Sequence, residues 1–500
     1  MNLKLPGILK HYDGTERPDT WIEDYYNAVT FAGGTPNIAC RMLQLYLVGP
    51  ARIWLSDLEK NSIFCWFDLK TAFEKHFRGT YKRPATTSDL QACIQKKGET
   101  SRHFLTRWLA CRNECENDLQ QLSAKSHQCR KGIDSLVLER AESLRATGAG
   151  ISLKANGWRV LEQLKVSEEL RELAVPLTGM DMKSIRSDKV IKVPYRNECR
   201  CVKRSDLVGT LARHLPAGSI RFGCQVEEIS LDPVTRYPIV STSNGSTIRA
   251  KVLIGCDGAN SVVAKFLGLK PVRFLPLWAA RGLTTFQEGH SFRNKFLNLV
   301  GKGMTFRLVP IDDKTIYFSA IQSRLPKGCA DSRDPSLIWQ VALQAMQGYP
   351  EEILDVVRSC EIESVTLAQI CYRAPWNMLL QPFQEGTVTV AGDAMHAMGP
   401  FIGQGGSASL EDALVLARCL AETATGDDQK PARSVQEVLR SYVKQRRWRI
   451  LRLCVQAFLN GQLIVASSNL KKVVLRAVVN VLFKGSTTSQ WHDQYDCGSL

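Results

Sequence analysis

The chain has 500 residues, of which 44% are hydrophobic and 23% charged, so wholesale disorder is excluded and there is room for roughly two to four domains. Its formal net charge of +16 is unevenly spread: residues 430–500 hold twelve Lys or Arg against three acids, whereas residues 1–127 hold seventeen against fourteen. A basic C-terminal region favours contact with phosphates or an anionic membrane surface, so a dedicated nucleic-acid domain is not expected.

Residues before about 120 indicate a small all-helical domain over 1–122. Trp, Tyr, Phe and Leu recur at helical intervals in WIEDYYNAV, ARIWLSDL, FDLKTAFEKHF and SRHFLTRWLACRNE. The motifs YDGTERPDTWIEDY, LYLVGPARIWLSDL, SIFCWFDLKTAFEKHF and RGTYKRP, in this order, resemble the gag core of gypsy-type LTR retrotransposons over about residues 8–118. That resemblance implies a capsid-like module capable of self-association.

Gag proteins often carry a zinc knuckle after this core, but the spacing of Cys111, Cys115, His127 and Cys129 does not match one. No metal site is therefore expected, and RNA binding ranks last among the possible functions. The sixteen cysteines are scattered without a CxxC pair, and the first residues lack the apolar core of a secretory signal. We interpret the cysteines as reduced thiols of a cytoplasmic or peripheral membrane protein.

After residue 130 the pattern becomes that of an α/β protein. Short β-branched segments end at Gly or Asp turns in SLVLE, KVLIGCD and TVTVAGD, and helical segments follow in KANGWRVLEQL, RSDLVGTLARHL and SLEDALVLARCL. This alternation predicts a parallel sheet. Glu139 ends the first of these strands, where an acid can accept both hydroxyl protons of an adenosine ribose, although a Glu at a strand end is common in itself.

The second segment with chemical character is KVLIGCDGANSVVAKFLG, residues 251–268. A buried strand is predicted to lead into Asp257 and Gly258, where small residues allow a ligand to approach the backbone, and then into a helix that begins near Ser261. A plain strand–turn–helix connection would produce the same string, and we favour the functional interpretation.

The third segment, residues 386–420, combines several features of a ligand-binding loop. A strand delivers Gly392 and Asp393 to its carboxyl end, and a loop without bulky side chains runs from Pro400 through Gly403 to Gly405. The helix that follows directs its free N–H groups at this loop and can stabilise negative charge on a bound ring system. His396 lies in the loop as well; we expect a packed or solvent-facing histidine more than a proton relay.

Together these segments resemble the FAD-dependent monooxygenases of the para-hydroxybenzoate hydroxylase class, most closely a plant group related to salicylate hydroxylase and zeaxanthin epoxidase, over about residues 128–500. The resemblance implies reduction of FAD by NAD(P)H and transfer of one oxygen atom of O2 to a small organic substrate, by hydroxylation or epoxidation. It implies no catalytic side chain and the following cofactor-binding residues: Glu139, Arg140, Arg204, Asp257, Gly258, Gly392, Asp393, Pro400, Gly403 and Gly405. Strands such as RFLPLWAARGLTTF and GMTFRLVPIDDKTIYFSAI are expected to form the substrate-covering sheet.

One part of the family pattern is missing. Where the family has a strand, a GxGxxG turn and a helix, this chain has NECENDLQQLSAKSHQ, and no glycine occurs between Gly98 and Gly132. The glycines of TGAGIS at 147–152 follow Glu139 and cannot supply the pyrophosphate turn. Since the first strand of such a sheet is central, its loss predicts two sheet fragments with unpaired inner edges and weak retention of FAD.

The predicted architecture is therefore multidomain: an all-α N-terminal domain precedes an incomplete Rossmann-like α/β FAD-binding domain with a β-rich substrate domain. The expected divisions are 1–122 (gag-like), 128–270 (first FAD-binding part), 271–380 (substrate sheet), 381–430 (GD motif and helix) and 431–500 (basic helical region). The alternative function is a catalytically inactive fusion of gag and flavoprotein that acts as a self-associating or interaction protein.

The basic C-terminal region has two interpretations. YVKQRRWRILRLCVQAFL either lies along a membrane with Trp448 and Leu451 inward or, as we favour, packs on the flavin domain with its arginines in water. The apolar stretch 463–483 is interrupted by Lys471, Lys472 and Arg476, so it predicts an amphipathic surface helix and not a transmembrane one.

Overall fold

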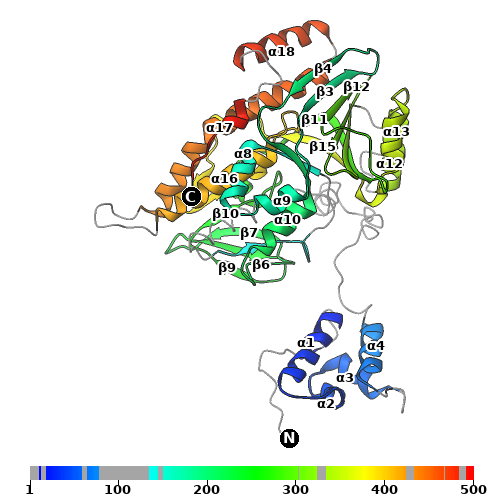
Figure 1. Cartoon of the computed structure of the whole chain (residues 1–500). Coiled ribbons are helices and arrows are strands. Elements are labelled where there is room, and N and C mark those ends of the chain that lie inside the picture. The colour runs from blue at the N-terminus through cyan, green and yellow to red at the C-terminus, as the bar shows by residue number, and fades with distance from the viewer. Residues whose placement is uncertain are drawn as a thin grey trace, which may run out of the picture. The chain divides into compact units, whose positions relative to one another are not determined.

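The computed structural model describes two units of the chain, 1–112 and 113–500, each of which is treated by itself (Figure 1). The described residues are 11–12, 18–58, 63, 65–77, 135–144, 150–301, 303–323, 334–423, 433–466, 468–483 and 491–499.

The first unit is helical and is built around aromatic side chains. Its elements are α1 (Pro18–Phe31), α2 (Pro36–Met42), η1 (Leu43–Leu45), α3 (Gly49–Ser56) and α4 (Trp66–Phe77). Trp21, Tyr25, Phe73 and Phe77 are buried together with Tyr12, and the Tyr25 hydroxyl donates to the carbonyl oxygen of Ala39 at 2.7 Å. The three helices predicted before residue 78 are thus confirmed, and the fourth, SRHFLTRWLACRNE, lies outside the described residues.

The second unit contains a seven-stranded, mostly antiparallel sheet in the order β15-β11-β14-β13-β12-β3-β4. Its strands are β3 (Gly179–Ser184), β4 (Val190–Pro194), β11 (Arg273–Thr285), β12 (Phe296–Val300), β13 (Met304–Pro310), β14 (Thr315–Gln322) and β15 (Thr366–Tyr372). Alternate residues bury one face under α12 (Pro335–Ala345) and α13 (Glu351–Arg358), which leaves the other face for the rest of the unit. The predicted strands of the substrate sheet are confirmed.

The predicted parallel strands fall into two separate sheets. β10 (Leu253–Gly255) pairs in parallel with β17 (Val388–Val390), which is flanked by β16 (Gln384–Glu385). β1 (Val137–Leu138) pairs in parallel with β6 (Ile220–Arg221) alone. No strand among the described residues joins the two sheets; residues 113–134, which precede β1, lie outside the described ranges, so the loss of the central strand remains a prediction.

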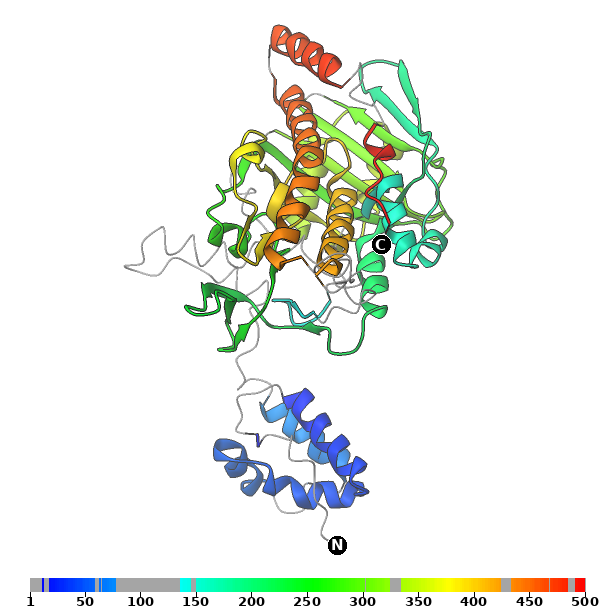
Figure 2. The ribbon, with the colours of Figure 1, turned by 90° about the vertical axis from the view of Figure 1, so that its left-hand side faces the viewer.

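Smaller sheets and helices complete the unit. β2 (Gly150–Lys154) pairs with β5 (Cys199–Lys203), and β7 (Val226–Leu231), β8 (Pro238–Thr242) and β9 (Thr247–Arg249) form a meander. The helices are α8 (Ala155–Gln163), α9 (Ser167–Glu172), α10 (Arg204–Arg213), α11 (Val262–Phe266), η2 (Ile362–Ser364), α14 (Asn377–Leu380), α15 (Asp393–His396), α16 (Gly405–Ala421), α17 (Val435–Val465), α18 (Asn469–Leu482) and η3 (Trp491–Gln494). Figure 2 shows α17 running alongside α16, with α18 at its far end.

The position of α17 confirms one part of the prediction for the C-terminal region and corrects another. The helix packs on the flavin side of the unit through Ile450 and Leu453, as favoured from the sequence. Its arginines are not all in water, however: Arg446 and Arg449 are buried, because they pair with carboxylates of α16. Trp448 is exposed on the outer face. No helix in the described part of the chain is both long and apolar enough to cross a bilayer.

Candidate flavin and substrate site

Two of the predicted segments meet at one edge of the β10–β17 pair. The parallel register places Gly255 opposite Val390, and the Ala391 amide donates to the Gly255 carbonyl at 3.0 Å. The pair Asp257–Gly258 therefore follows β10, and the pair Gly392–Asp393 follows β17 at the equivalent position. The carboxyl edge of parallel strands is where α/β folds bind nucleotides.

Asp257 is oriented by the start of α11. Its Oδ2 accepts hydrogen bonds from the amides of Val262 (2.6 Å) and Val263 (3.4 Å), while the Ser261 hydroxyl caps the same helix. The other oxygen, Oδ1, is buried and has no hydrogen-bond partner among the described residues. Burial raises the pKa of Asp257. The next residue, Gly258, has φ of 77° and so lies in the left-handed region, where the absence of a side chain lets a ligand come close. A buried acceptor without a partner at this place can accept a hydrogen bond from a hydroxyl group of a ligand.

The Gly392 turn is fixed by a carboxylate from α16. Gly392 has φ of 59°, and its amide donates to Asp412 Oδ2 at 2.9 Å. The same oxygen lies 2.7 Å from His396 Nε2, and Asp412 Oδ1 accepts from Arg446 Nε at 2.6 Å. Although burial alone would raise the pKa of Asp412, Arg446 and His396 lower it to about 2. His396 is fully buried, as expected for a packed histidine.

The glycine loop between α15 and α16 is open on one side. Gly403 has φ of 62°, and an added Cβ at Gly403 or Gly405 would meet nothing within 4 Å. Gly405 begins α16, so free amides of a 17-residue helix line this space. Pro400 lies at the start of the loop, and its carbonyl oxygen accepts from Arg307 at 3.1 Å. A planar ring system can therefore approach the backbone here without meeting side chains.

Gln404, in the middle of this loop, is held by the C-terminal segment. Its Nε2 donates to Asp493 Oδ1 and lies near His492 Nδ1, both at 3.1 Å, and its Oε1 accepts from Asn156 Nδ2 at 2.9 Å. All four side chains are buried. The loop conformation thus depends on η3, which is almost ninety residues further along the chain.

The remaining predicted residues lie on other elements. Glu139 directly follows β1, is buried, and its Oε1 accepts from the Ala141 amide at 2.8 Å. Arg140 comes next in the chain and is half-buried. Arg204 is the first residue of α10. The structure therefore brings Asp257–Gly258, the DG turn, and Gly392–Asp393, the GD turn, together on one sheet edge. It places Glu139 and Arg140 beside the separate β1–β6 pair.

A row of polar side chains crosses the large sheet on the face opposite α12 and α13. Strand register pairs Arg281 with Ser319, Ser319 with Arg307, and Arg307 with Asn298, so the four side chains project from one face. Arg307 reaches the Pro400 carbonyl, which shows that this face lies against the glycine loop. Burial lowers the pKa of Arg307, and the charge of Arg281 adds to this effect. Asn298 Oδ1 is buried without a hydrogen-bond partner among the described residues.

Sequence reasoning did not identify this polar row or the buried ion network. Two acids, Glu411 and Asp412, inside an otherwise apolar helix were a usable signal, because a charge in a buried helix needs a partner. The row across the sheet could not be found from sequence, since only strand register brings its members together.

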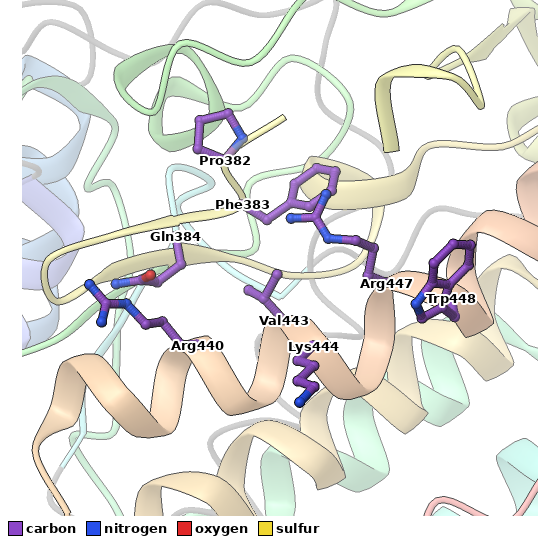
Figure 3. A pocket seen from close by; sticks show the side chains of 8 residues that line it. All are labelled: Pro382, Phe383, Gln384, Arg440, Val443, Lys444, Arg447 and Trp448. Carbon is purple, nitrogen blue, oxygen red and sulfur yellow. The ribbon is translucent and has the colours of Figure 1, made fainter. Parts of the chain in front are cut away.

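A surface pocket of about 290 Å³ lies elsewhere, between the segment before β17 and α17 (Figure 3). It is lined by Pro382, Phe383, Gln384, Arg440, Val443, Lys444, Arg447 and Trp448. None of these is a predicted flavin residue. Arg447 donates to the carbonyls of Met378, Leu379 and Gln381, so it serves to fasten α14 to α17.

Comparisons with known proteins agree with this arrangement. A family model described as "FAD binding domain" matches residues 122–457. Monooxygenase 1 of Arabidopsis thaliana is 40% identical over 378 residues, which cover 74% of this chain and 94% of that protein. Monooxygenase 2 of the same plant is 32% identical over 385 residues, covering 74% of this chain and 93% of that protein.

Solved structures show the same fold. Klebsiella pneumoniae HpxO complexed with FAD and uric acid superposes with a TM-score of 0.60 at 22% identity, over 73% of this chain and 94% of that one. At this identity the likeness concerns the fold alone. The DG and GD turns, the unpaired Asp257 oxygen and the open glycine loop fit the flavin and ribityl part of FAD. The sequence has no GxGxxG turn before Glu139 that would hold its pyrophosphate.

Proposed function

The chain belongs to the FAD-dependent monooxygenases that share this FAD binding domain, and from this premise we propose that it uses FAD, NAD(P)H and O2 to hydroxylate or epoxidise a small organic substrate. The observation that carries the proposal is the open glycine loop with the DG and GD turns on one side and the polar row of the sheet on the other. When bound, the flavin supplies the oxygen chemistry. The protein's residues orient cofactor and substrate and exclude water.

The experiment is a turnover assay with saturating FAD. Purified protein is supplied with NADH or NADPH under isotopically labelled O2, and products are analysed by mass spectrometry. We expect one labelled oxygen atom in the product and faster NAD(P)H oxidation when substrate is present. Failure of NAD(P)H to be oxidised at any FAD concentration would support the alternative of an inactive fusion, which has no support from relatives named as monooxygenases and hydroxylases.

The polar row favours a substrate that carries an anionic group. Arg281 and Arg307 direct two cations at the space beside the glycine loop, and Asn298 and Ser319 add groups that can hydrogen-bond to ring substituents. A guanidinium in a partly desolvated site binds a carboxylate or an enolate oxygen strongly. We therefore propose an aromatic acid or a similarly acidic heteroaromatic ring.

Replacing Arg307 tests the substrate class. Arg307→Met removes one charge-assisted interaction of about 1.5–3 kcal/mol, so KM for an aromatic carboxylate should rise roughly 10- to 100-fold, with little change for the corresponding amide. Arg249→Met, at an exposed ion pair with Asp232, is the control and should leave KM unchanged. Equal losses for carboxylate and amide would contradict the anionic class.

The flavin domain is proposed to lack its first βαβ unit. The two sheets that flank the missing position are compatible with this, as is the absence of a GxGxxG turn before Glu139. If two or three hydrogen bonds to the pyrophosphate are missing, at about 1.5–3 kcal/mol each, FAD affinity is lower by roughly two to six decades. The enzyme would then exchange FAD with solution.

The N-terminal unit is proposed to be a gag-like module that self-associates. Leu45, Val48 and Ile53 are exposed on its surface, which suits contact with a second copy. Light scattering of the full chain should show a mass that falls when Ile53→Glu is introduced. A monomeric mass for the unmodified chain at every concentration would exclude this role. We also propose peripheral membrane contact for the basic C-terminal region 431–500.

A further inference from the structure

Helix α18 exposes an apolar stripe. Leu470, Val474, Val478 and Val481 recur at intervals of four, four and three residues, with Val473 beside Val474, so all five share one side of the helix. Leu470 and Val481 are 74% and 81% exposed. Such a contiguous apolar strip on a surface helix marks an interaction site.

The opposite face of α18 is anchored to the rest of the unit. Val479 is fully buried, and Phe483, which directly follows the helix, is buried and stacks on Trp491 with ring centroids 6.2 Å apart. The helix also packs against α17. The apolar stripe therefore faces outward while the opposite face of the helix is already packed against the protein.

The charges of α18 are all positive. Lys471 borders the stripe, Lys472 and Arg476 lie toward the face of Val479, and the helix contains no Asp or Glu. A lysine side chain at the border of an apolar surface can extend its charge along that surface toward anionic groups. An apolar face on a helix whose charges are all positive is typical of a helix that lies in a membrane interface.

A second basic element lies at the same end of the unit. Figures 1 and 2 both place the β3–β4 hairpin beside α18 at this end. The hairpin exposes Val190 and Ile191. Arg186, Lys189 and Lys192 are also exposed there, against one acid, Asp188. Two segments distant in sequence thus present the same mixture of apolar and cationic side chains.

We propose that α18 docks in the plane of an anionic membrane, with the β3–β4 hairpin contacting the lipid headgroups beside it. With 14 residues α18 is about 21 Å long, shorter than the bilayer core, so it lies on the membrane and does not span it. A second copy of the chain is a poorer occupant, because two α18 helices joined through their stripes carry six positive charges and neither helix supplies a carboxylate to offset them. This inference specifies the peripheral contact proposed for region 431–500 and is independent of flavin chemistry, since binding is measured without turnover.

The test is co-sedimentation of the full chain with two kinds of vesicle, phosphatidylcholine alone and equal parts of phosphatidylcholine and phosphatidylserine. We expect binding to the mixed vesicles, decreasing with added salt. Val474→Glu combined with Val481→Glu should abolish it. Replacing Lys471, Lys189 and Lys192 by Gln should weaken it about 100-fold, at roughly fivefold per cation. Val234→Glu, at an exposed valine in the β7–β8 connection, is the matched control and should bind normally.

Three results would overturn the proposal. The unmodified chain could fail to sediment with mixed vesicles, the stripe variant could bind as well as the control, or the control could lose binding to the same extent. A mass by light scattering that is dimeric for the unmodified chain and monomeric for the stripe variant, without vesicle binding, would assign the stripe to a second copy. Because the stripe residues are exposed, all variants should retain the thermal unfolding midpoint of the unmodified chain.

Discussion

Arg446 and Arg358 each pair with two carboxylates, but only Arg446 does so in the interior. Arg446 contacts Asp412 and Glu411 with no exposure on any partner, whereas Arg358 meets Glu351 and Asp355 on the surface. Arg446→Gln removes the guanidinium that pairs with the buried carboxylates of Asp412 and Glu411. We therefore expect a loss of about 3–5 kcal/mol in the free energy of unfolding. Arg358→Gln should change it little, because solvent screens an exposed ion pair. Urea unfolding of both variants checks this, and similar losses would contradict it.

Asp412 also predicts a dependence of stability on pH. Its pKa in the folded protein is about 2, below the ordinary value of 3.8. The stabilisation is therefore complete above about pH 4 and is lost as the pH falls toward 2. The shift corresponds to about 2 kcal/mol. The stability difference between the unmodified chain and Asp412→Asn should shrink by this amount between pH 4 and pH 2, measured by urea unfolding; a constant difference would contradict the assignment.

At the level of single residues, the sequence predicted the motif residues but not the side chains that hydrogen-bond to them and hold them in place. Asp257, Gly392 and the glycine loop follow short strands in recognisable strings, so their neighbourhood could be inferred from sequence, although their roles remain predictions. Asp412 and Gln404 acquire their roles from Arg446 and Asp493, which are far along the chain. Sequence spacing alone does not indicate such pairs.

Among the elements, η3 is the one that we expect to hold the glycine loop in its conformation. Asp493 accepts from Gln404, whose amide nitrogen also lies near His492 Nδ1, so Asp493→Ala removes one of two partners of a buried amide at a cost of about 1 kcal/mol. We expect a lower unfolding midpoint and weaker FAD binding, followed by flavin fluorescence. Asp496→Ala, at an exposed acid three residues later, is the control and should change neither. Unchanged FAD affinity in Asp493→Ala would show that η3 does not position the loop.

The elements that carry the motifs could be predicted, because their hydrophobic period and turn residues agree with the final structure. The strands at 137, 253 and 388 and the helices α8, α10 and α16 occur where their patterns indicate. The burial of α17 was predicted, yet the burial of its arginines was not, because their partners lie on α16. Among the described residues β1–β6 and β10–β17 are separate sheets, and the loss of a strand between them stays a prediction.

For the whole molecule, sequence and structure agree on a helical N-terminal unit and an α/β unit with a large substrate-side sheet. Hydrophobic periodicity predicted a helical first unit and an α/β second unit, and the family resemblance predicted the β-rich substrate sheet. It could not predict the face of the large sheet that meets the glycine loop, since this depends on register across four strands. The family relation supplies the chemistry, and the chain-specific question is how FAD is held.

The most direct test is retention of FAD by the full chain. The protein is incubated with excess FAD, passed through gel filtration, and its visible spectrum is recorded, while affinity is measured separately by titration of flavin fluorescence. Because the DG and GD turns are present and a pyrophosphate turn is predicted to be missing, we expect saturable but weak binding, with little flavin left after filtration. A stoichiometric flavin band that survives filtration would contradict this account.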